Sequence, residues 1–299
     1  MRFMTSTGNK GPQDGSQSRS QAKASRREQM RQEMLRQQAA AQRKAQLKTA
    51  GGVALVVIVI AVIALAVVLN TGGDKAKAPS GPVASDVIGA VTGVSSATID
   101  AVGAGTSNNP PVAVKSPTPL TADGKPRVLY VGGEFCPFCA AERWSVVNAL
   151  SRFGTFSNLG QTSSSSTDVY PDTATLTFHG ASYTSDYLSF TGAELTDRDH
   201  NQLDTLSGAD EKTVGTLNPK GSIPFIVYGG RFTTSGAGYD PQVLQGKTHQ
   251  QIADALKDPN SAITQAIVGQ ANQITAALCQ LTDQKPANVC GAAGVKAAA

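Results

Sequence analysis

Residues 51–69 form an unbroken apolar run, GGVALVVIVIAVIALAVVL, with no charged and no strongly polar side chain. A helix rises 1.5 Å per residue, so this run spans about 28 Å, close to the hydrocarbon thickness of a bilayer. A buried helix of a soluble domain rarely continues this far without a polar position. A cleaved signal peptide, the closer alternative, usually has a shorter apolar stretch and a shorter basic leader. The sequence therefore predicts one uncleaved transmembrane helix over residues 50–70.

The charge distribution predicts how this helix is oriented. The whole chain has a formal net charge of +4. Residues 1–49 contain 11 Lys and Arg against 3 Asp and Glu, a net charge of +8, and the remaining 250 residues have a net charge of −4. Because basic flanks stay on the cytoplasmic side of a membrane, residues 1–49 are expected to be a basic, partly disordered cytoplasmic segment. The lipid bilayer is then the expected partner of the N-terminal part, and no nucleic-acid partner is predicted.

The segments after residue 70 are expected outside the cytoplasm, in an oxidising compartment where disulfides persist. Residues 71–84 are rich in Gly, Pro and Lys and are interpreted as a linker. Residues 85–290 are interpreted as an extracytoplasmic domain, and residues 291–299 as a disordered tail. This localisation in the cell membrane makes all four cysteines of the chain candidates for disulfide chemistry.

The strongest chemical motif is Cys136-Pro137-Phe138-Cys139. It follows a short β-prone run that ends in two glycines, and it precedes a stretch whose large apolar residues have helical spacing. At the start of a helix, the sulfur of the first cysteine lies near unpaired amide N–H groups that stabilise its thiolate. The second cysteine, one helical turn later, is close enough to form a disulfide with the first. We therefore interpret Cys136 as the nucleophile and Cys139 as the resolving thiol.

Pro137, Phe138 and Glu134 are expected to tune the acidity of Cys136. Pro137 suits the first turn of a helix, where its missing N–H costs nothing, but it also removes one amide from the cluster around the sulfur. Glu134 adds a negative charge, which opposes thiolate formation. Arg143 lies on the other side of the motif, and it either adjusts the pKa together with Glu134 or forms a solvated salt bridge.

A CxxC pair also occurs in zinc sites and in purely structural disulfides. A zinc site needs a second cysteine pair at similar spacing, whereas Cys279 and Cys290 are eleven positions apart, so no metal is predicted. The oxidising compartment and the short Pro286-containing loop instead favour a structural disulfide between Cys279 and Cys290 that holds the C-terminus. A catalytic relay pair is the alternative role for these two cysteines.

A second motif, Ser222-Ile223-Pro224-Phe225, opens another β-prone run. The order strand, CxxC and helix, followed by Ile-Pro, strand, Gly-Gly, strand and helix, resembles the thioredoxin superfamily over about residues 126–280. This resemblance implies that Ile223–Pro224 is a cis peptide beside the cysteine pair. It also implies that the backbone before the proline binds substrate.

Two features depart from the minimal thioredoxin pattern. The Pro137-Phe138 dipeptide is more similar to the Pro-Tyr of glutaredoxins than to the Gly-Pro of thioredoxin. In addition, 88 positions separate Cys136 from Pro224, which predicts an insertion within residues 155–215, in or beside the site. The expected fold is α/β: a thioredoxin-like domain with an insertion between the CxxC helix and the cis-proline strand, preceded by a single transmembrane helix.

Three strings, FCPFCAAERW, ALSRFGTF and FHGASYTSDYLSF, resemble a family of membrane-anchored thioredoxin-like proteins called domain of unknown function 929. That family has no assigned reaction, so the resemblance supports the fold and leaves the function open. The function predicted from the motifs is a membrane-anchored thiol–disulfide oxidoreductase. Its partners would be thiols or disulfides of extracytoplasmic proteins and a membrane electron-transfer protein.

The alternative function is a binding or assembly module of the cell envelope that keeps the fold without redox turnover. No bound cofactor is expected in either case, because electrons would pass through cysteines alone. Oxidase, reductase and isomerase share these residues, so the sequence does not predict the direction of transfer. His179 would move protons if the inserted strands reach the site, but an ordinary strand histidine is the simpler interpretation.

Overall fold

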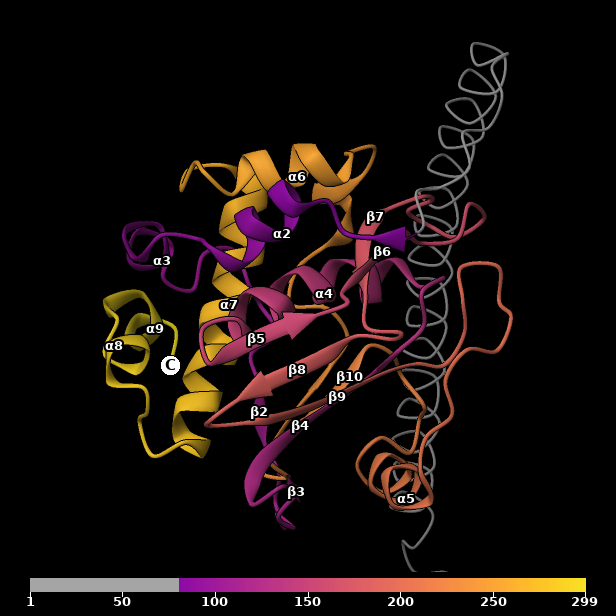
Figure 1. Ribbon diagram of the computed structural model, residues 1–299, viewed down its shortest axis with the longest axis vertical. Coiled ribbons are helices and arrows are strands. Elements are labelled where there is room, and N and C mark those ends of the chain that lie inside the picture. The colour runs from indigo at the N-terminus through magenta and orange to yellow at the C-terminus, as the bar shows by residue number, and fades with distance from the viewer. Residues whose placement is uncertain (1–80) are drawn as a thin grey trace, which may run out of the picture. The chain divides into compact units, whose positions relative to one another are not determined.

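The computed structural model describes residues 81–299, which form a mixed α/β structure (Figure 1). The predicted cytoplasmic segment, the predicted transmembrane helix and the linker up to residue 80 lie outside the described residues. Within residues 81–299, no helix combines the length and the apolar composition needed to span a membrane.

The main sheet is built around β4 (Lys125–Gly132), the strand that leads to the cysteine motif. β4 pairs in parallel with β9 (Ser189–Glu194) and antiparallel with β10 (Phe225–Tyr228). β10 turns back into β11 (Phe232–Ser235), and β11 pairs with the short edge strand β2 (Val112–Ala113). The β-branched and aromatic residues of β4 and β10 favour this central position, because such side chains pack well on a pleated surface.

The turn between β10 and β11 depends on two glycines. Gly229 and Gly230 have φ values of +57° and +73°, a conformation that residues with a Cβ rarely adopt. A Cβ on Gly230 would also collide with the backbone carbonyl of Thr118. The Gly-Gly pair noticed in the sequence therefore makes the tight turn that brings β11 back beside β10.

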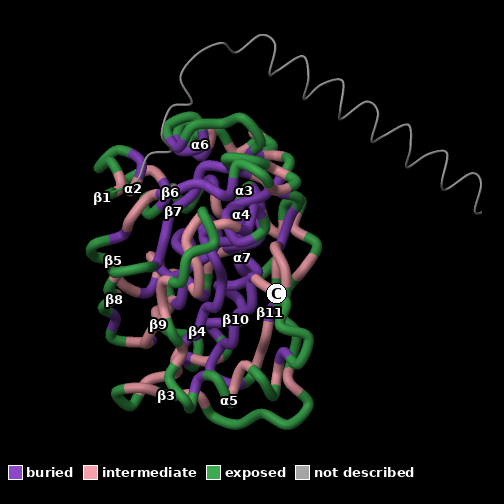
Figure 2. Tube along the Cα trace, turned by 90° about the vertical axis from the view of Figure 1, so that its right-hand side faces the viewer, coloured by how far each residue is buried: buried purple, intermediate pink, exposed green. Residues whose placement is uncertain are grey.

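Side chains of β4 and β10 alternate between two faces of the sheet, and each face has its own core. The larger core includes α4 (Pro137–Leu150) and α7 (Ala262–Leu281), which pack against each other; its residues from the two strands are Val128, Tyr130, Ile226 and Tyr228. The opposite core lies under α5 (Gly208–Leu217); its residues from the strands are Leu129, Val131, Phe225 and Val227. Every residue of α4 except Phe138 is buried, and Figure 2 shows this helix as part of the interior.

The segment predicted from the sequence as an insertion, a name we keep for it, follows α4 and contains two antiparallel strand pairs. β5 (Gly154–Ser157) pairs with β8 (Ser182–Ser185), and β6 (Gly160–Ser163) pairs with β7 (Ala174–Thr177). β6 also pairs with β1 (Gly81–Pro82). The remaining elements are β3 (Thr121–Ala122), α2 (Ser85–Thr92), α3 (Ser96–Val102), η1 (Pro241–Leu244), α6 (His249–Ala255), α8 (Ala287–Cys290) and α9 (Ala293–Ala297).

One local prediction from the sequence was wrong. Residues 291–299 were expected to be a disordered tail, but they contain α9, which packs on α3 with Val295 buried and with the Gly294 N–H donating to Asp100 Oδ1 at 2.8 Å. A run of four serines, residues 163–166, has the composition of a mobile loop, yet Ser163 ends β6 and residues 163–165 are buried. Tertiary packing buries both small-residue segments, which composition alone marks as flexible.

Candidate functional site

Cys136 lies at the junction where β4 passes into α4. It is the N-cap residue of α4, and the backbone N–H of Cys139 donates to its sulfur at 3.3 Å. Both cysteines are free thiols. The Cys136 residue is 7% exposed and Cys139 is 0% exposed, so the first cysteine is the one nearer to solvent. This geometry places the Cys136 sulfur at the unpaired amide end of the helix, where negative charge is stabilised.

The surroundings shift the acidities of the two thiols in opposite directions. A hydrogen bond from the Cys139 thiol lowers the pKa of Cys136 to about 7, with further help from backbone N–H groups and from the charge of Arg143, although burial acts against the shift. Burial raises the pKa of Cys139 well above its ordinary value, and hydrogen bonding to Cys136 adds to the increase. Cys136 is thus the thiol that ionises first, and Cys139 keeps its proton.

The positive charge near the cysteines comes from a buried ion pair. The Arg143 guanidinium donates from Nε to Glu194 Oε1 and from Nη2 to Glu194 Oε2, both at 2.7 Å, and Nη2 also donates to the Gly133 carbonyl at 2.7 Å. Both side chains are 0% exposed. This pair joins α4 to the end of β9, and its bond to Gly133 also fixes the loop that precedes Cys136.

The ion pair decides between the two roles predicted for Arg143. Arg143 was expected either to adjust the pKa of the motif, as Glu134 was, or to form a solvated salt bridge; its charge does lower the pKa of Cys136, but the salt bridge is fully buried and formed with Glu194. Glu134 is itself buried; its N–H donates to the Thr196 carbonyl at 2.8 Å, and its carboxylate accepts from Thr162 Oγ1 at 3.3 Å. Glu134 therefore connects the motif to β6 and to the segment that follows β9.

A buried tyrosine completes the charged cluster below the cysteines. Tyr130 is 0% exposed and lies on β4, two positions before Gly132, the first of the two glycines that precede the motif. Burial raises the pKa of its hydroxyl well above the ordinary value, and Arg143, Cys139 and Glu194 are all close enough to act on it electrostatically. The floor of the site is therefore a buried polar group of one tyrosine, one arginine and one glutamate.

The second sequence motif lies at the same end of the sheet as the cysteine motif. The Ile223–Pro224 peptide bond is cis. Phe225 is paired with Val131 in the antiparallel register of β10 and β4. Pro224, one residue earlier, therefore lies opposite the end of β4, from which the chain continues into the loop to Cys136. Pro224 is buried, whereas Ile223 is partly exposed. Strand pairing thus brings the Ile-Pro backbone beside the segment that holds the cysteines.

The insertion packs directly on the first turns of α4. The Ser165 N–H donates to the Phe135 carbonyl at 2.8 Å, and Thr175 Oγ1 donates to the Ala140 carbonyl at 2.8 Å. Trp144 Nε1 donates to the Ala174 carbonyl at 3.1 Å. These three bonds hold the β6–β7 pair against the motif, so the inserted segment forms one wall of the site.

Another buried carboxyl group, that of Glu142, lies one turn after Cys139. Glu142 accepts from the Gly238 N–H at 2.9 Å and from Gln270 Nε2 at 3.1 Å. Burial raises its pKa from 4.5 to about 7, and the two hydrogen bonds oppose this change. Glu142 faces α7 and the chain after β11, so it links the cysteine helix to the opposite part of the core.

His179 lies in the turn between β7 and β8 and is not a strand residue. Its Nδ1 is 2.7 Å from Asp204 Oδ1, and Asp204 Oδ2 accepts the Glu194 backbone N–H at 2.9 Å. The histidine is about half exposed. The contacts of His179 lead to the backbone of β9, and none of them reaches a sulfur atom.

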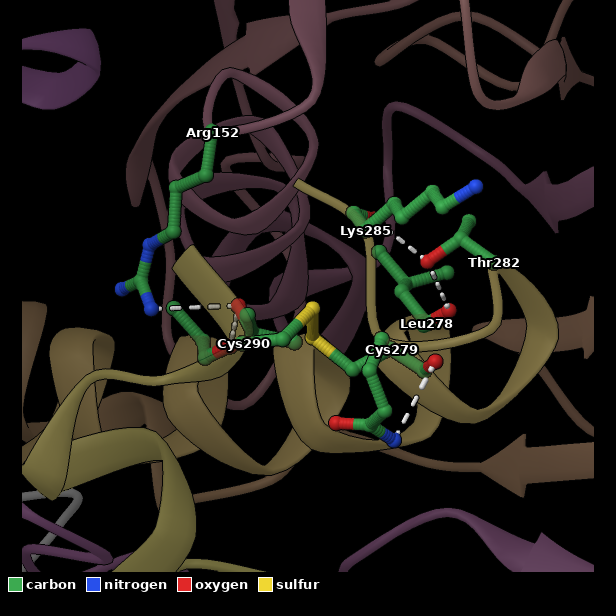
Figure 3. The surroundings of a disulfide bond; sticks show 9 residues. Arg152, Leu278, Cys279, Thr282, Lys285 and Cys290 are labelled. Carbon is green, nitrogen blue, oxygen red and sulfur yellow. Dashed lines mark hydrogen bonds between the residues drawn. A yellow bond between two sulfur atoms is a disulfide. The ribbon is translucent and has the colours of Figure 1, made fainter. Parts of the chain in front are cut away.

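Cys279 and Cys290 form a disulfide with an S–S distance of 1.96 Å and a Cα–Cα distance of 5.6 Å (Figure 3). The bond joins the end of α7 to α8 and lies near Arg152, just past the C-terminal end of α4. Cys136 is at the other end of α4, whose 14 residues span about 21 Å. This separation favours a structural role over a relay role. The pairing also leaves no second cysteine pair for a zinc site.

Residues 111–219 match the family model described as "Domain of unknown function (DUF929)". The matched segment contains β4, the cysteine motif, the insertion and α5, and it ends before the cis-proline. Neither a curated protein nor a solved structure matches the chain.

Two residues of the matched segment were missed by the sequence reasoning. Glu194 is the single charged residue of β9, and Tyr130 lies within the apolar run of β4. A lone carboxylate at the end of a strand was a usable signal, because a buried charge needs a partner. Its partner Arg143 is 51 positions away, and no local pattern in the sequence connects the two residues.

Proposed function

We propose that this protein is a membrane-anchored thiol–disulfide oxidoreductase and that residues 81–299 are its thioredoxin-like, extracytoplasmic domain. The observation that carries the proposal is the sulfur of Cys136 at the start of α4, with a pKa lowered to about 7, beside the buried thiol of Cys139. A thiolate of this acidity is populated at neutral pH and is a competent nucleophile toward disulfides.

The order of elements supports a thioredoxin-like architecture. A strand leads to the CxxC motif and its helix, and after the insertion a cis Ile223–Pro224 leads to a strand, a Gly-Gly turn, a second strand and α7. The apolar run at residues 51–69 supports the membrane anchor. The disulfide between Cys279 and Cys290 supports an oxidising compartment, since such bonds are rare in the cytosol.

The proposed reaction is a two-step exchange. In the first step the Cys136 thiolate attacks one sulfur of a client disulfide, a new S–S bond joins Cys136 to the client, and the other client sulfur leaves and takes up a proton. In the second step Cys139 loses its proton and attacks the Cys136 sulfur, which releases the first client sulfur as a thiol. The two protein thiols thereby lose two electrons and two protons to the client, and the reverse sequence oxidises a client.

The groups of the site have distinct roles in this scheme. The Cys139 N–H and the charge of Arg143 stabilise the Cys136 thiolate. The raised pKa of Cys139 keeps the second thiol protonated until the mixed disulfide has formed. The Ile223 backbone, at the partly exposed edge of the site, is the segment proposed to pair with the client chain.

The first test is the pH dependence of alkylation of the full-length, reduced protein. Samples are treated briefly with iodoacetamide at a series of pH values, and peptide mass spectrometry measures the modification of each cysteine separately. Modification of Cys136 is expected to rise with a midpoint near about 7, while Cys139 stays unmodified. A Cys136 midpoint at or above the ordinary value of about 8.5 would contradict the proposal.

A second candidate function, a binding module without redox turnover, is favoured by one observation. Cys136 is only 7% exposed and Cys139 is 0% exposed. Equilibration of the protein in glutathione buffers separates the two functions and also gives the direction of transfer. A potential near about −120 mV indicates an oxidant and one near about −270 mV a reductant, whereas a CxxC pair that does not change state indicates a binding module.

A further inference from the structure

Exposed apolar side chains lie on the rim of the cysteine site. Three large hydrophobic residues are exposed within residues 81–299, and two of them are here: Phe138 at 41% and Val169 at 62%. The Phe138 ring packs edge-on against Tyr170, with ring centroids 6.2 Å apart. We call Phe138, Val169 and Tyr170 the apolar rim. Exposed hydrophobic groups that gather beside a reactive group are typical of a contact surface for a partner.

The apolar rim is held in place by the insertion. The loop that carries Val169 and Tyr170 is attached to the cysteine motif by the bond from the Ser165 N–H to the Phe135 carbonyl. Farther along the same loop, Asp172 pairs with Arg198 at 2.6 Å, and Arg198 also donates to the Ser164 carbonyl at 3.3 Å. The position of the rim relative to Cys136 is therefore fixed by several bonds.

Acidic side chains lie on loops next to the apolar rim. Of the seven Asp and Glu in residues 155–205, Glu194, Asp172 and Asp204 already face Arg143, Arg198 and His179, and the charges that matter here are on Asp197 and Asp199. The loop with Asp197 and Asp199 lies against the motif, since the Thr196 carbonyl accepts the Glu134 N–H and the His200 ring lies 4.4 Å from that of Phe135. On the other side, burial and the neighbouring Asp240 carboxylate raise the pKa of the Tyr170 hydroxyl.

We propose that this rim selects client segments in which the reacting cysteine is flanked by an aromatic or aliphatic side chain and by a lysine or arginine. The inference rests on the proposed function, because it assigns the substrate class of the same site. The apolar side chain would pack on Phe138 and Tyr170, and the cation would lie among the carboxylates. Small acidic thiols such as glutathione fit this surface poorly, because the rim repels their carboxylates.

The test compares two peptides of equal length, Gly-Phe-Cys-Lys-Gly and Gly-Ser-Cys-Glu-Gly, each joined to 2-thiopyridine through a disulfide. When reduced full-length protein attacks the peptide sulfur, an S–S bond to Cys136 forms and 2-thiopyridone leaves, which is followed by absorbance. Each rate is divided by the rate with neutral 2,2′-dithiodipyridine, which reports the reactivity of the thiol alone. The Phe/Lys peptide is expected to react about tenfold faster, and added salt should reduce the ratio.

Matched variants locate the source of the preference. Tyr170→Ser and the double variant Asp197→Asn with Asp199→Asn should each lower the ratio by at least about threefold. Their controls are Val112→Ser, which removes the third exposed hydrophobic side chain, on β2, and Asp123→Asn, in the turn between β3 and β4. Both controls should leave the ratio unchanged.

The possible outcomes separate this inference from the proposed function. Equal normalised rates for the two peptides, with rapid reaction of both, would overturn the substrate class and leave the redox function standing. Absence of reaction with both peptides and with the neutral probe would overturn both proposals. A ratio that falls as much in Val112→Ser as in Tyr170→Ser would overturn the assignment of the preference to the rim.

Discussion

Replacement of Arg143 by methionine should strongly destabilise the protein. The change removes two hydrogen bonds to Glu194 and one to the Gly133 carbonyl, all of 2.7 Å, in a place where both charged side chains are 0% exposed. Glu194 is then left buried without its cation. Breaking a buried pair in this way typically lowers the free energy of unfolding by about 3–5 kcal/mol, because the desolvation of the remaining charge is no longer compensated.

A double-mutant cycle tests whether the loss of stability comes from the interaction between Arg143 and Glu194. Glu194→Met alone leaves Arg143 buried and unpaired, so a loss of about 3–5 kcal/mol is expected again. The double variant Arg143→Met with Glu194→Met has no buried charge, and methionine fills a similar volume. Its loss should be smaller than the sum of the two single losses by about 2 kcal/mol or more.

Urea unfolding of the four full-length proteins provides the measurement. The chain has a single tryptophan, Trp144, which is fully buried on α4 one position after Arg143, so its fluorescence reports the packing of this helix. Linear extrapolation gives each free energy of unfolding. Additive losses, or a loss below about 1 kcal/mol in Arg143→Met, would refute the argument that the two charges depend on each other.

Arg143→Met should also change the reactivity of Cys136. The positive charge of Arg143 is one of the causes that lower the pKa of Cys136. Without it, the midpoint of Cys136 alkylation should move above about 7. If the midpoint does not move in a variant that is still folded, the charge of Arg143 does not act on the thiolate.

Three further predictions concern pH, the disulfide and topology. Because the pKa of Glu142 is raised from 4.5 to about 7, its protonated form stabilises the fold, and the free energy of unfolding should fall by about 3 kcal/mol as the pH rises between these values. Glu142→Gln should remove most of this fall. If the free energy of unfolding falls equally with pH in both proteins, Glu142 is not the group responsible. Replacement of Cys279 and Cys290 by alanine should lower stability by about 3 kcal/mol in chemical unfolding; an unchanged unfolding midpoint would contradict this. In intact cells, an impermeant thiol reagent should label cysteines introduced after residue 75 but not those before residue 45, and the reverse pattern would contradict the proposed localisation.

Much of the site could be predicted from local sequence patterns. A β-prone run, two glycines and helical spacing located the strand-to-helix junction at Cys136, and β4 and α4 meet there. A cysteine inside the first turn of a helix lies under the following turns, and Cys139 at that position is 0% exposed. Cys279 and Cys290 are close in sequence and bracket a short loop, so their pairing required no knowledge of distant contacts.

The rest of the site depends on contacts between distant segments. Arg143 and Glu194 meet only because β9 pairs in parallel with β4, and the sequence does not contain the register of that pairing. The β6–β7 wall is similar: Ser163 and its neighbours are polar and small, so they suggest a mobile loop until they are packed against α4. The polar and apolar residues alternate over much of residues 173–183, a pattern that favours one continuous strand, but the turn at His179 divides this segment between β7 and β8.

The measurement that tests the central claim most directly is covalent trapping of clients by two single variants of the full-length protein. In Cys139→Ser the first attack remains available but resolution does not, so mixed disulfides with client proteins should accumulate in cells and should dissolve on reduction. In Cys136→Ser the nucleophile is absent, and the remaining thiol is fully buried with a raised pKa, so almost no client should be trapped. Equal trapping by the two variants, or none by either, would contradict the account of this site as a thiol–disulfide exchange centre.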